Sequence, residues 1–317
     1  MDMVFIGELM AASMFLGVIG MLMLGFPVAF TLAGTSILFG LVGLGLGVFD
    51  FSNMAALAGR YTGYMTNEVL VAVPLFIFMG VMLERSNIAE QLLTTMSKLF
   101  GNMRGGLGIS VVIVGALLAA STGVVGATVV TMGLISLPAM IKAGYDPKLA
   151  CGTISASGTL GQIIPPSTVL IFMGDMIAGM HSQAQMSLGN FAPSAVSVGD
   201  LFAGAFLPGM LLVVVYICYI LFKAVVDPES CPATPVAPED RKNLPREIIV
   251  ALVPPLLLIM AVLGSILGGV ATPTEASSVG AVGATLLATL RGKMSFAIIK
   301  HTVQSTAKIT SMIFIIL

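Results

Sequence analysis

An interrupted apolar run holds the residues of this sequence that are best suited to chemistry. Residues 155–167 read Ser-Ala-Ser-Gly-Thr-Leu-Gly-Gln-Ile-Ile-Pro-Pro-Ser within an uncharged stretch. Neither Pro165 nor Pro166 has a backbone N–H, so a continuous helix would leave the carbonyls of Gly161 and Gln162 without partners. An unpaired carbonyl is costly in an apolar medium, so the break must face protein, water or a bound cation.

These groups match the ligands of a hard monovalent cation. Released carbonyls and the hydroxyls of Ser and Thr supply neutral oxygen ligands without a buried charge. A broken helix also presents half-helix ends, of which the N-terminal end favours an anionic group and the carbonyl end favours Na⁺. No Asp or Glu occurs in the apolar runs 105–141 and 149–174, which favours Na⁺ over H⁺ as the ion.

The apolar run 105–141 supplies a second element. It has a basic residue beside each end, and basic residues favour the cytoplasmic side, so both ends face the cytoplasm. A split at Ser121-Thr122-Gly123 gives two arms of about 16 to 18 residues, or roughly 24 to 27 Å, slightly short of an apolar core of about 30 Å. The pattern predicts a re-entrant hairpin. Two full crossings joined by a tight turn are an alternative that the charges leave open.

A purely structural explanation of the same residues also stays open. Small residues let membrane helices approach closely, and a pair of prolines can merely kink a span. Gly123, Gly126, Gly158 and Gly161 each fit that role singly. The combination of a hairpin tip with a broken helix favours one half of an ion and substrate site.

The elements that position these residues must cross a lipid bilayer. The chain of 317 residues is 57% hydrophobic and 9% charged, whereas soluble domains carry about 25% charged residues. This composition predicts an all-α polytopic membrane protein. The net charge of −1, without a cluster of Lys and Arg, excludes a nucleic-acid partner. Ser121 and Ser157 have no nearby His or carboxylate to activate them, which argues against an enzyme.

Uncharged runs place the membrane spans. The first two spans are predicted at 5–24 and 28–48, separated by Gly25-Phe26-Pro27. The later runs are 69–83, 105–141, 149–174, 201–222, 248–270 and 276–290. With all basic residues but Arg60 on the cytoplasmic side, the N-terminus and the loops 175–200 and 268–275 lie outside.

Three smaller features complete this assignment. Residues 86–100 place apolar side chains at helical spacing, which predicts an amphipathic arm along the membrane surface; these are Ile88, Leu92, Met96 and Leu99. The segment Thr272-Pro273-Thr274-Glu275 predicts a capping box that starts a helix. We expect His181 and His301 in solvated loops.

Five motifs in order give a more specific indication. They are Leu24-Gly25-Phe26-Pro27-Val28-Ala29-Phe30, Val73-Pro74-Leu75-Phe76-Ile77-Phe78-Met79-Gly80, Gly144-Tyr145-Asp146, Gly161-Gln162-Ile163-Ile164-Pro165-Pro166-Ser167 and Ala271-Thr272-Pro273-Thr274-Glu275-Ala276. Together they resemble the large membrane subunit of TRAP transporters, the DctM-like family, over essentially the whole chain.

The resemblance implies an elevator-type ion transporter in the bacterial inner membrane. A Na⁺ gradient drives uptake of an organic acid, which a periplasmic substrate-binding protein delivers, and a small four-helix membrane subunit braces the scaffold. Na⁺ is the coupling ion, and neither an organic cofactor nor a transition metal is implied. The residues that the resemblance assigns to the ion and substrate site are Ser121, Thr122, Gly123, Ser155, Ser157, Gly158, Thr159, Pro165, Pro166 and Ser167.

The resemblance also divides the chain into five parts. These are N-terminal scaffold helices (1–83), an amphipathic arm (84–104), a transport-domain hairpin and broken helix (105–174), an outer loop, span and cytoplasmic linker (175–247), and the start of a second scaffold (248–317). The outer loop 181–198 and the Pro-rich linker 227–246 look longer than those of the family's shorter members.

The final apolar run, 309–317, is too short to cross a bilayer, which predicts a C-terminal truncation within a span and a chain that does not transport alone. Two alternatives remain beside the TRAP permease. One is a sodium/dicarboxylate-type symporter that needs no binding protein, and the other is an inactive fragment of either transporter.

Overall fold

The computed structural model describes residues 3–316 apart from 124, 193 and 236–237. The side chains of several further residues, Ser121 and Thr122 among them, lie outside the described part. Every regular element within that part is helical, and the chain divides into two compact units. Four described helices are long and apolar enough to cross a membrane. The chain is therefore an all-α polytopic membrane protein.

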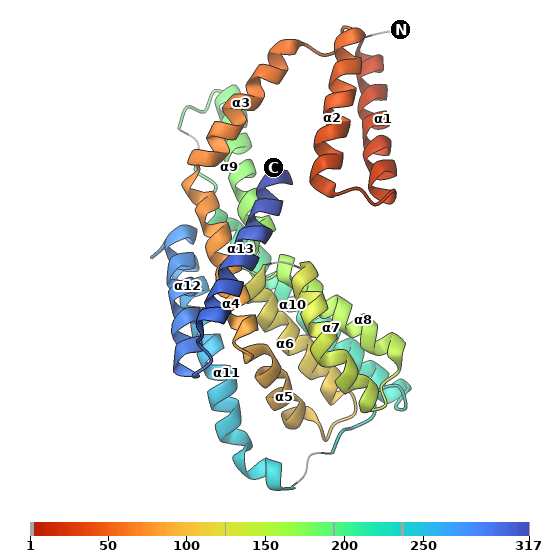
Figure 1. Cartoon of the computed structure of the whole chain (residues 1–317), viewed down its shortest axis with the longest axis vertical. Coiled ribbons are helices and arrows are strands. Elements are labelled where there is room, and N and C mark those ends of the chain that lie inside the picture. The colour runs from red at the N-terminus through yellow and green to blue at the C-terminus, as the bar shows by residue number, and fades with distance from the viewer. Residues whose placement is uncertain (1–2, 124, 193, 236–237, 317) are drawn as a thin grey trace. The chain divides into compact units, whose positions relative to one another are not determined.

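The first unit comprises Met1–Asn67 and Ala307–Leu317. Its helices are α1 (Met3–Met23), α2 (Val28–Gly45) and α3 (Phe51–Thr66). The first two pack side by side around the predicted Gly25-Phe26-Pro27 turn, where Gly25 has a φ of 85° (Figure 1). Both pass as candidate spans, and few of their residues are buried within the chain.

The second unit runs from Glu68 to Thr306. Its elements are η1 (Glu68–Val71), α4 (Ala72–Arg85), α5 (Ile88–Phe100), α6 (Gly106–Thr122), α7 (Val125–Lys142), α8 (Pro147–Thr159), η2 (Leu160–Gln162), α9 (Thr168–Ser187), α10 (Val198–Val226), α11 (Pro238–Leu267), α12 (Pro273–Leu290) and the first part of α13 (Phe296–Ile316). The helix α12 lies along α4, and α8 packs against both α6 and α7 (Figure 1).

Local sequence signals set several helix starts. The predicted capping box is confirmed, because the Thr272 side chain accepts from the backbone N–H of Glu275 and the Glu275 carboxylate accepts from that of Thr272. Ser197 and Asp200 form an equivalent box at the start of α10. Asp146 caps α8, whose first residue is proline, a residue suited to that position.

The arm predicted at 86–100 forms α5, which bends from the preceding helix by 63°. Three of its four predicted apolar positions, Ile88, Leu92 and Met96, are buried, whereas Leu99 is exposed. The buried face is covered by protein, because α5 packs against α6 and α11. Its position along a membrane surface stays a prediction.

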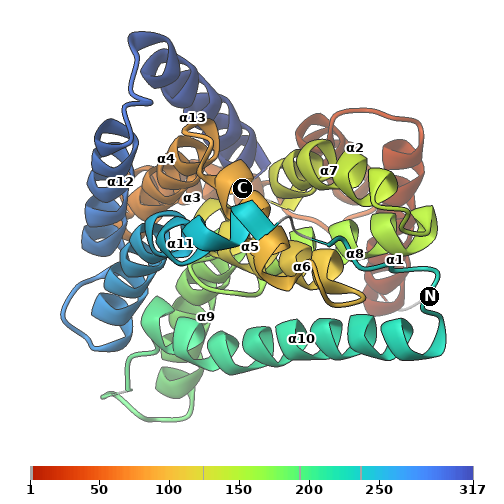
Figure 2. The ribbon, with the colours of Figure 1, turned by 90° about the horizontal axis from the view of Figure 1, so that it is seen from below.

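An apolar core anchors the region around the break in the chain. It joins α6, η2, α10 and α11 through seven buried residues: Ile109, Val112, Leu160, Ile164, Val213, Ile220 and Ile259. Gly209 of α10 allows this approach, since a Cβ there would lie 2.9 Å from a carbon of the Ile164 side chain. Figure 2 shows α10 along its full length beside this group of helices. The broken segment is thereby packed against α6, α10 and α11.

The helix α11 contains a second proline pair, Pro254-Pro255, but continues through it. These residues cannot donate to the carbonyls of Val250 and Ala251. Arg291 replaces the missing donors, with Nη2 2.6 Å from the Val250 carbonyl and 3.4 Å from that of Ala251. Its Nη1 donates to the Gln91 side chain at 2.6 Å, so one guanidinium joins α5, α11 and the end of α12.

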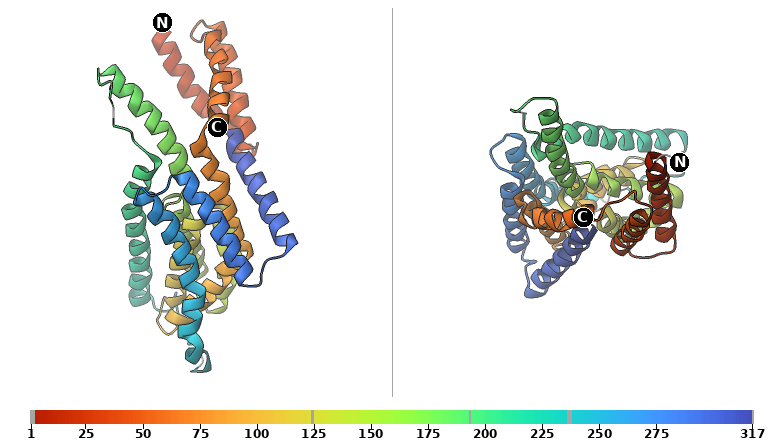
Figure 3. Two further views of the ribbon diagram at one scale, coloured as in Figure 1. Left: turned by 90° about the vertical axis from the view of Figure 1, so that its left-hand side faces the viewer. Right: turned by 90° about the horizontal axis from the view of Figure 1, so that it is seen from above.

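Three loop predictions are wrong. His181 lies in α9, which continues to Ser187 and shortens the predicted outer loop, and His301 lies in α13. Figure 3 shows α9 in green and α13 in dark blue as continuous helices. The linker prediction 227–246 overran the start of α11 at Pro238. Proline is tolerated in the first helical turn, so a proline-rich segment can still begin a helix.

Candidate ion and substrate site

The hairpin turn forms where the sequence predicts it. The arms α6 and α7 meet at Gly123, whose φ of 59° lies in the left-handed region that glycine tolerates best. The arms pack against each other, and they contain 17 and 18 residues. The re-entrant course of this hairpin stays a prediction, as does the alternative of two full crossings. The side chains of Ser121 and Thr122, both assigned to the site from sequence, lie outside the described residues.

The carbonyl of Gly123 ties this tip to the broken helix. It accepts hydrogen bonds from Gln162 Nε2 and from Thr168 Oγ1, each at 2.8 Å. A carbonyl oxygen has two lone pairs, so both are engaged. The three residues form what we call the tip clasp: Gly123, Gln162 and Thr168.

The break itself lies between the end of η2 and the start of α9. Ser167 is fully buried, and its hydroxyl donates to the Gln162 carbonyl at 2.9 Å. The same oxygen lies 3.4 Å from the backbone nitrogen of Leu170 and caps α9. The sequence predicts that the Gln162 carbonyl needs a partner other than a backbone N–H, from protein, water or a cation. The Ser167 hydroxyl is such a partner and replaces the N–H that Pro166 cannot supply.

The remaining predicted residues separate by burial. Pro165 and Pro166 are buried at the break, whereas Ser155 and Thr159 are exposed. Ser157 is fully buried and donates to the Ile154 carbonyl of its own helix at 3.0 Å. The structure therefore brings Ser167 and the prolines beside the tip clasp. Ser155 and Thr159 lie on α8 and are exposed.

Close helix packing accounts for part of the glycine pattern. A Cβ at Gly158 would lie 2.4 Å from a Val129 methyl, and one at Gly115 would lie 2.7 Å from the Ser157 Cβ. At Gly126 a Cβ would meet nothing within 4 Å. The packing explanation thus holds for Gly158, which lets α8 contact α7 closely, and it finds no support at Gly126.

Sequence reasoning missed Gln162 and Thr168 as partners of the hairpin tip. The available signal was an amide inside an apolar run, since a buried polar side chain needs a hydrogen-bond partner. It also missed Tyr145, a buried side chain between α7 and α8 whose hydroxyl accepts from the N–H of Gly108 at 3.3 Å. Burial raises the pKa of Tyr145 to about 12. This hydrogen bond joins the start of α6 to the segment that follows α7.

One carboxylate contacts the hairpin from α4. Thr131 Oγ1 of α7 donates to Glu84 Oε1 at 2.6 Å, and both residues are half-buried. The residues of the tip clasp and of the break all have uncharged side chains. Among the described residues, no group of three or more His, Cys, Asp or Glu could hold a metal ion. The tip clasp and the break therefore offer neutral oxygens, whereas the Glu84 carboxylate contacts α7 at Thr131.

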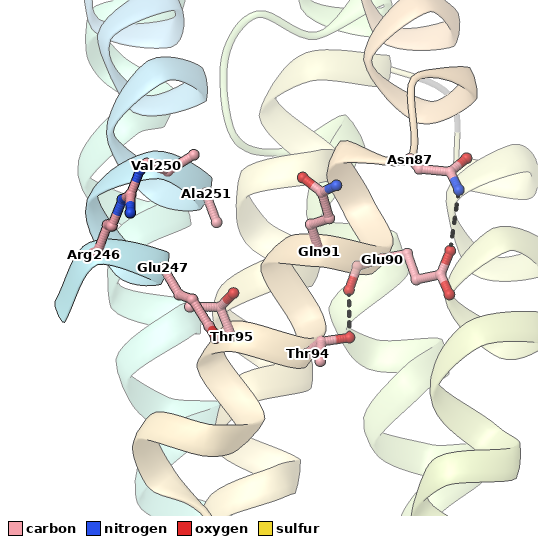
Figure 4. Close-up of a pocket in the computed structure, with 9 residues that line it drawn as sticks. All are labelled: Asn87, Glu90, Gln91, Thr94, Thr95, Arg246, Glu247, Val250 and Ala251. Carbon is pink, nitrogen blue, oxygen red and sulfur yellow. Dashed lines mark hydrogen bonds between the residues drawn. The ribbon is translucent and has the colours of Figure 1, made fainter. Parts of the chain in front are cut away.

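A polar cavity of about 700 Å³ lies elsewhere, between α5 and the start of α11 (Figure 4). Its walls carry Glu90, Gln91, Arg246 and Glu247 among nine lining residues. Lys98 pairs with Glu247 at 3.0 Å. The cavity thus mixes both signs of charge and belongs to the joint between α5 and α11, not to the tip clasp.

Comparisons with known proteins all point to one family of transport proteins. A family model described as "Tripartite ATP-independent periplasmic transporter, DctM component" matches residues 15–317. The "C4-dicarboxylate TRAP transporter large permease protein DctM" of Vibrio cholerae is 33% identical over 279 residues, which are 86% of this chain and 54% of the relative. The ectoine/5-hydroxyectoine permease UehC of Ruegeria pomeroyi is 30% identical over 97% of this chain and 66% of its own length. The 2,3-diketo-L-gulonate permease YiaN of Escherichia coli is 26% identical over 96% of this chain and 65% of its own length.

Proposed function

The chain belongs to the DctM component family of tripartite ATP-independent periplasmic transporters, and from this premise we propose that it imports an organic acid by Na⁺ symport as part of a large permease. The family consists of transport permease components, not enzymes. The chain spans about half the length of the Vibrio cholerae relative and up to 66% of the others described. The activity of a whole permease is accordingly part of the proposal.

The observation that supports this function best is the tip clasp beside an uncharged break. The Gly123 carbonyl, the Ser167 hydroxyl and the ends of η2 and α9 meet at one place. Neutral oxygens are suitable ligands for Na⁺, and the N-terminus of α9 favours an anionic group. The proposed site residues are those predicted from sequence: Ser121, Thr122, Gly123, Ser155, Ser157, Gly158, Thr159, Pro165, Pro166 and Ser167.

The proposed substrate is an organic acid of unspecified size. The names of the relatives refer to C4-dicarboxylate, to ectoine and 5-hydroxyectoine, and to 2,3-diketo-L-gulonate, which are different molecules. We propose as partners a small four-helix membrane subunit and a periplasmic binding protein, in the bacterial inner membrane. The division into scaffold, arm and transport segments belongs to the same proposal.

The test is uptake of candidate organic acids into proteoliposomes. The permease in its complete form would be reconstituted with its small subunit and binding protein, with and without an inward Na⁺ gradient. We expect uptake that needs both the gradient and the binding protein. Uptake driven equally well by a proton gradient alone would contradict Na⁺ symport, and uptake without the binding protein would indicate the ordinary symporter instead.

A further inference from the structure

A second cavity, of about 530 Å³, lies among α6, α8 and α10 and is called the α8–α10 cavity below. Its volume falls within the range of about 300 to 1,000 Å³ that is typical of ligand sites. The cavity is separate from the tip clasp, and its lining includes neither Gly123 nor Ser167. The α8 wall consists of Lys148, Leu149, Gly152, Thr153 and Ala156.

The floor of the cavity is apolar and fixed. Val112 of α6 and Ile220 of α10 line it, and both belong to the buried core described above. Leu149 and Val215 extend this surface toward the mouth. A ligand that fills the cavity therefore needs an apolar part.

The rim of the cavity presents hydrogen-bond donors. The Lys148 ammonium and the hydroxyls of Tyr216 and Tyr219 have no hydrogen-bond or ion-pair partner in the described chain. Lys223 pairs with Asp227, at 3.6 Å on the surface, where such pairs contribute little. The rim thus offers two cations and two phenolic donors to one ligand.

Anionic side chains are fewer than cationic ones among the lining residues. Asp146 supplies the one carboxylate among the lining residues, and its Oδ1 accepts from the backbone N–H of Lys148 at 2.9 Å as the cap of α8. The α8 helix of 13 residues also directs its N-terminus here, which adds partial positive charge. Two cations and two phenolic donors, against one carboxylate that already caps α8, fit a phosphate group.

The apolar part of the ligand has a path along α10. This helix is a candidate span of 29 residues, and Leu211, Val214 and Phe222 on it are each more than half exposed. Tyr219, which lines the cavity, is 52% exposed on the same helix. A molecule with a phosphate head and hydrocarbon tails would contact both the rim and this surface.

We propose that the α8–α10 cavity binds the headgroup of an anionic phospholipid whose acyl chains lie along α10. Basic pockets between membrane helices at the cytoplasmic side are suited to such headgroups. A zwitterionic choline headgroup fits less well, because its quaternary ammonium would lie near Lys148 and Lys223. This inference goes beyond the proposed transport function and does not depend on Na⁺ coupling.

The bound lipid would contact the half-helix that carries four of the predicted site residues. Gly152, Thr153 and Ala156 line the cavity, and Ser155 and Ser157 flank the last of these in sequence. Occupation of the cavity would therefore support α8 from the side opposite its glycine contact with α7.

The experiment is native mass spectrometry of the delipidated chain in dodecyl maltoside micelles doped with phosphatidylglycerol or phosphatidylcholine. We expect one tightly retained phosphatidylglycerol and much weaker retention of phosphatidylcholine. The double variant Lys148→Gln/Lys223→Gln should lose phosphatidylglycerol about tenfold or more, since each basic residue contributes ~1 kcal/mol near an anionic lipid. Lys142→Gln, which removes a basic residue outside the cavity lining, should retain it.

A filling variant tests the cavity independently of charge. Gly152 lines the cavity, and a Cβ there would meet nothing within 4 Å, so we expect the side chain of Gly152→Leu to occupy the cavity and expel the lipid. Gly133→Leu, another helical position with open space, is the matched control. Circular dichroism would confirm that each variant is folded.

Three results would overturn the proposal. They are equal retention of both lipids by the unmodified chain, unchanged phosphatidylglycerol retention in both the charge and the filling variants, and thermal protection by inorganic phosphate equal to that given by the lipid. The last result would show a site for free anions.

Discussion

The chain contains two proline pairs, and the backbone around them adopts different structures. At Pro165-Pro166 the helix stops, and a new one starts only at Thr168. At Pro254-Pro255 the helix α11 continues unbroken. Each pair removes two backbone donors, so each leaves carbonyls that something else must satisfy.

The replacement donors also differ between the two pairs. A neutral hydroxyl, that of Ser167, serves the Gln162 carbonyl at the first pair. A guanidinium, that of Arg291, serves both carbonyls at the second. The second pair is thus closed by a permanent cation, which excludes Na⁺, whereas the first is closed by groups that can also face a cation. We therefore predict that the type of replacement donor, not the presence of prolines, determines which proline pair is suited to ion binding.

The largest effect is expected from Ser167→Ala. The change removes the cap of α9 and the partner of the Gln162 carbonyl, and each loss costs about 1 kcal/mol, giving about 2 kcal/mol of unfolding free energy. SDS titration in mixed micelles would measure it. Ser187→Ala, which removes an exposed hydroxyl bonded to Ala184, is the control. Equal stability of the two variants would show that the first break does not need its hydroxyl.

A slightly smaller loss is expected from Arg291→Leu. Two carbonyls and the Gln91 amide lose a donor, but they are partly solvated, so we expect about 1 to 2 kcal/mol. The two proline pairs should then differ in their response to Na⁺. Stabilisation by NaCl relative to choline chloride should persist in Arg291→Leu and fall in Ser167→Ala. The opposite pattern would reverse the assignment of the ion site.

Thr168→Val tests the tip clasp with a smaller change. It removes one of the two donors to the Gly123 carbonyl while Gln162 keeps the other, so about 0.5 to 1.5 kcal/mol should be lost. Thermal unfolding in detergent would measure the change. An unaltered melting temperature would mean that Gln162 alone holds the tip.

The smallest effect is expected from Pro255→Ala, which restores an N–H for the Ala251 carbonyl. Stability should change by only a few tenths of a kcal/mol, because Arg291 already supplies that carbonyl. In this background Arg291→Leu should cost less than it does alone. A double-mutant cycle with zero coupling would disprove the substitution of one donor for the other.

Local signals predicted the elements that need only neighbouring residues. The capping box at Thr272, the turn at Gly123 and the break at the first proline pair follow from residues within a few positions, and the structure contains each. The contacts of the tip clasp join residues 39 and 45 positions apart, so they depend on how the hairpin docks. Arg291 and Gln91 are 200 positions apart, and no spacing rule pairs them.

Helix ends were the weakest prediction for a related reason. The polar residues after Gly174 suggested a loop, yet α9 continues to Ser187. Hydroxyl and amide side chains can be accommodated on a helix, as with Ser187, which bonds to the Ala184 carbonyl. Polarity alone therefore did not locate the end of the helix.

The doubly bonded carbonyl of Gly123 has a consequence for the order of events in the proposed transport. A cation that coordinates this oxygen must displace the Gln162 amide or the Thr168 hydroxyl, so its binding is an exchange of ligands and not a simple addition. Each displaced group is a hydrogen-bond donor left without an acceptor, and the carboxylate of an organic acid is a strong acceptor. Cation binding would thereby leave a free hydrogen-bond donor for the carboxylate of the organic acid. The two binding events would be coupled through the hydrogen bonds of Gln162 and Thr168.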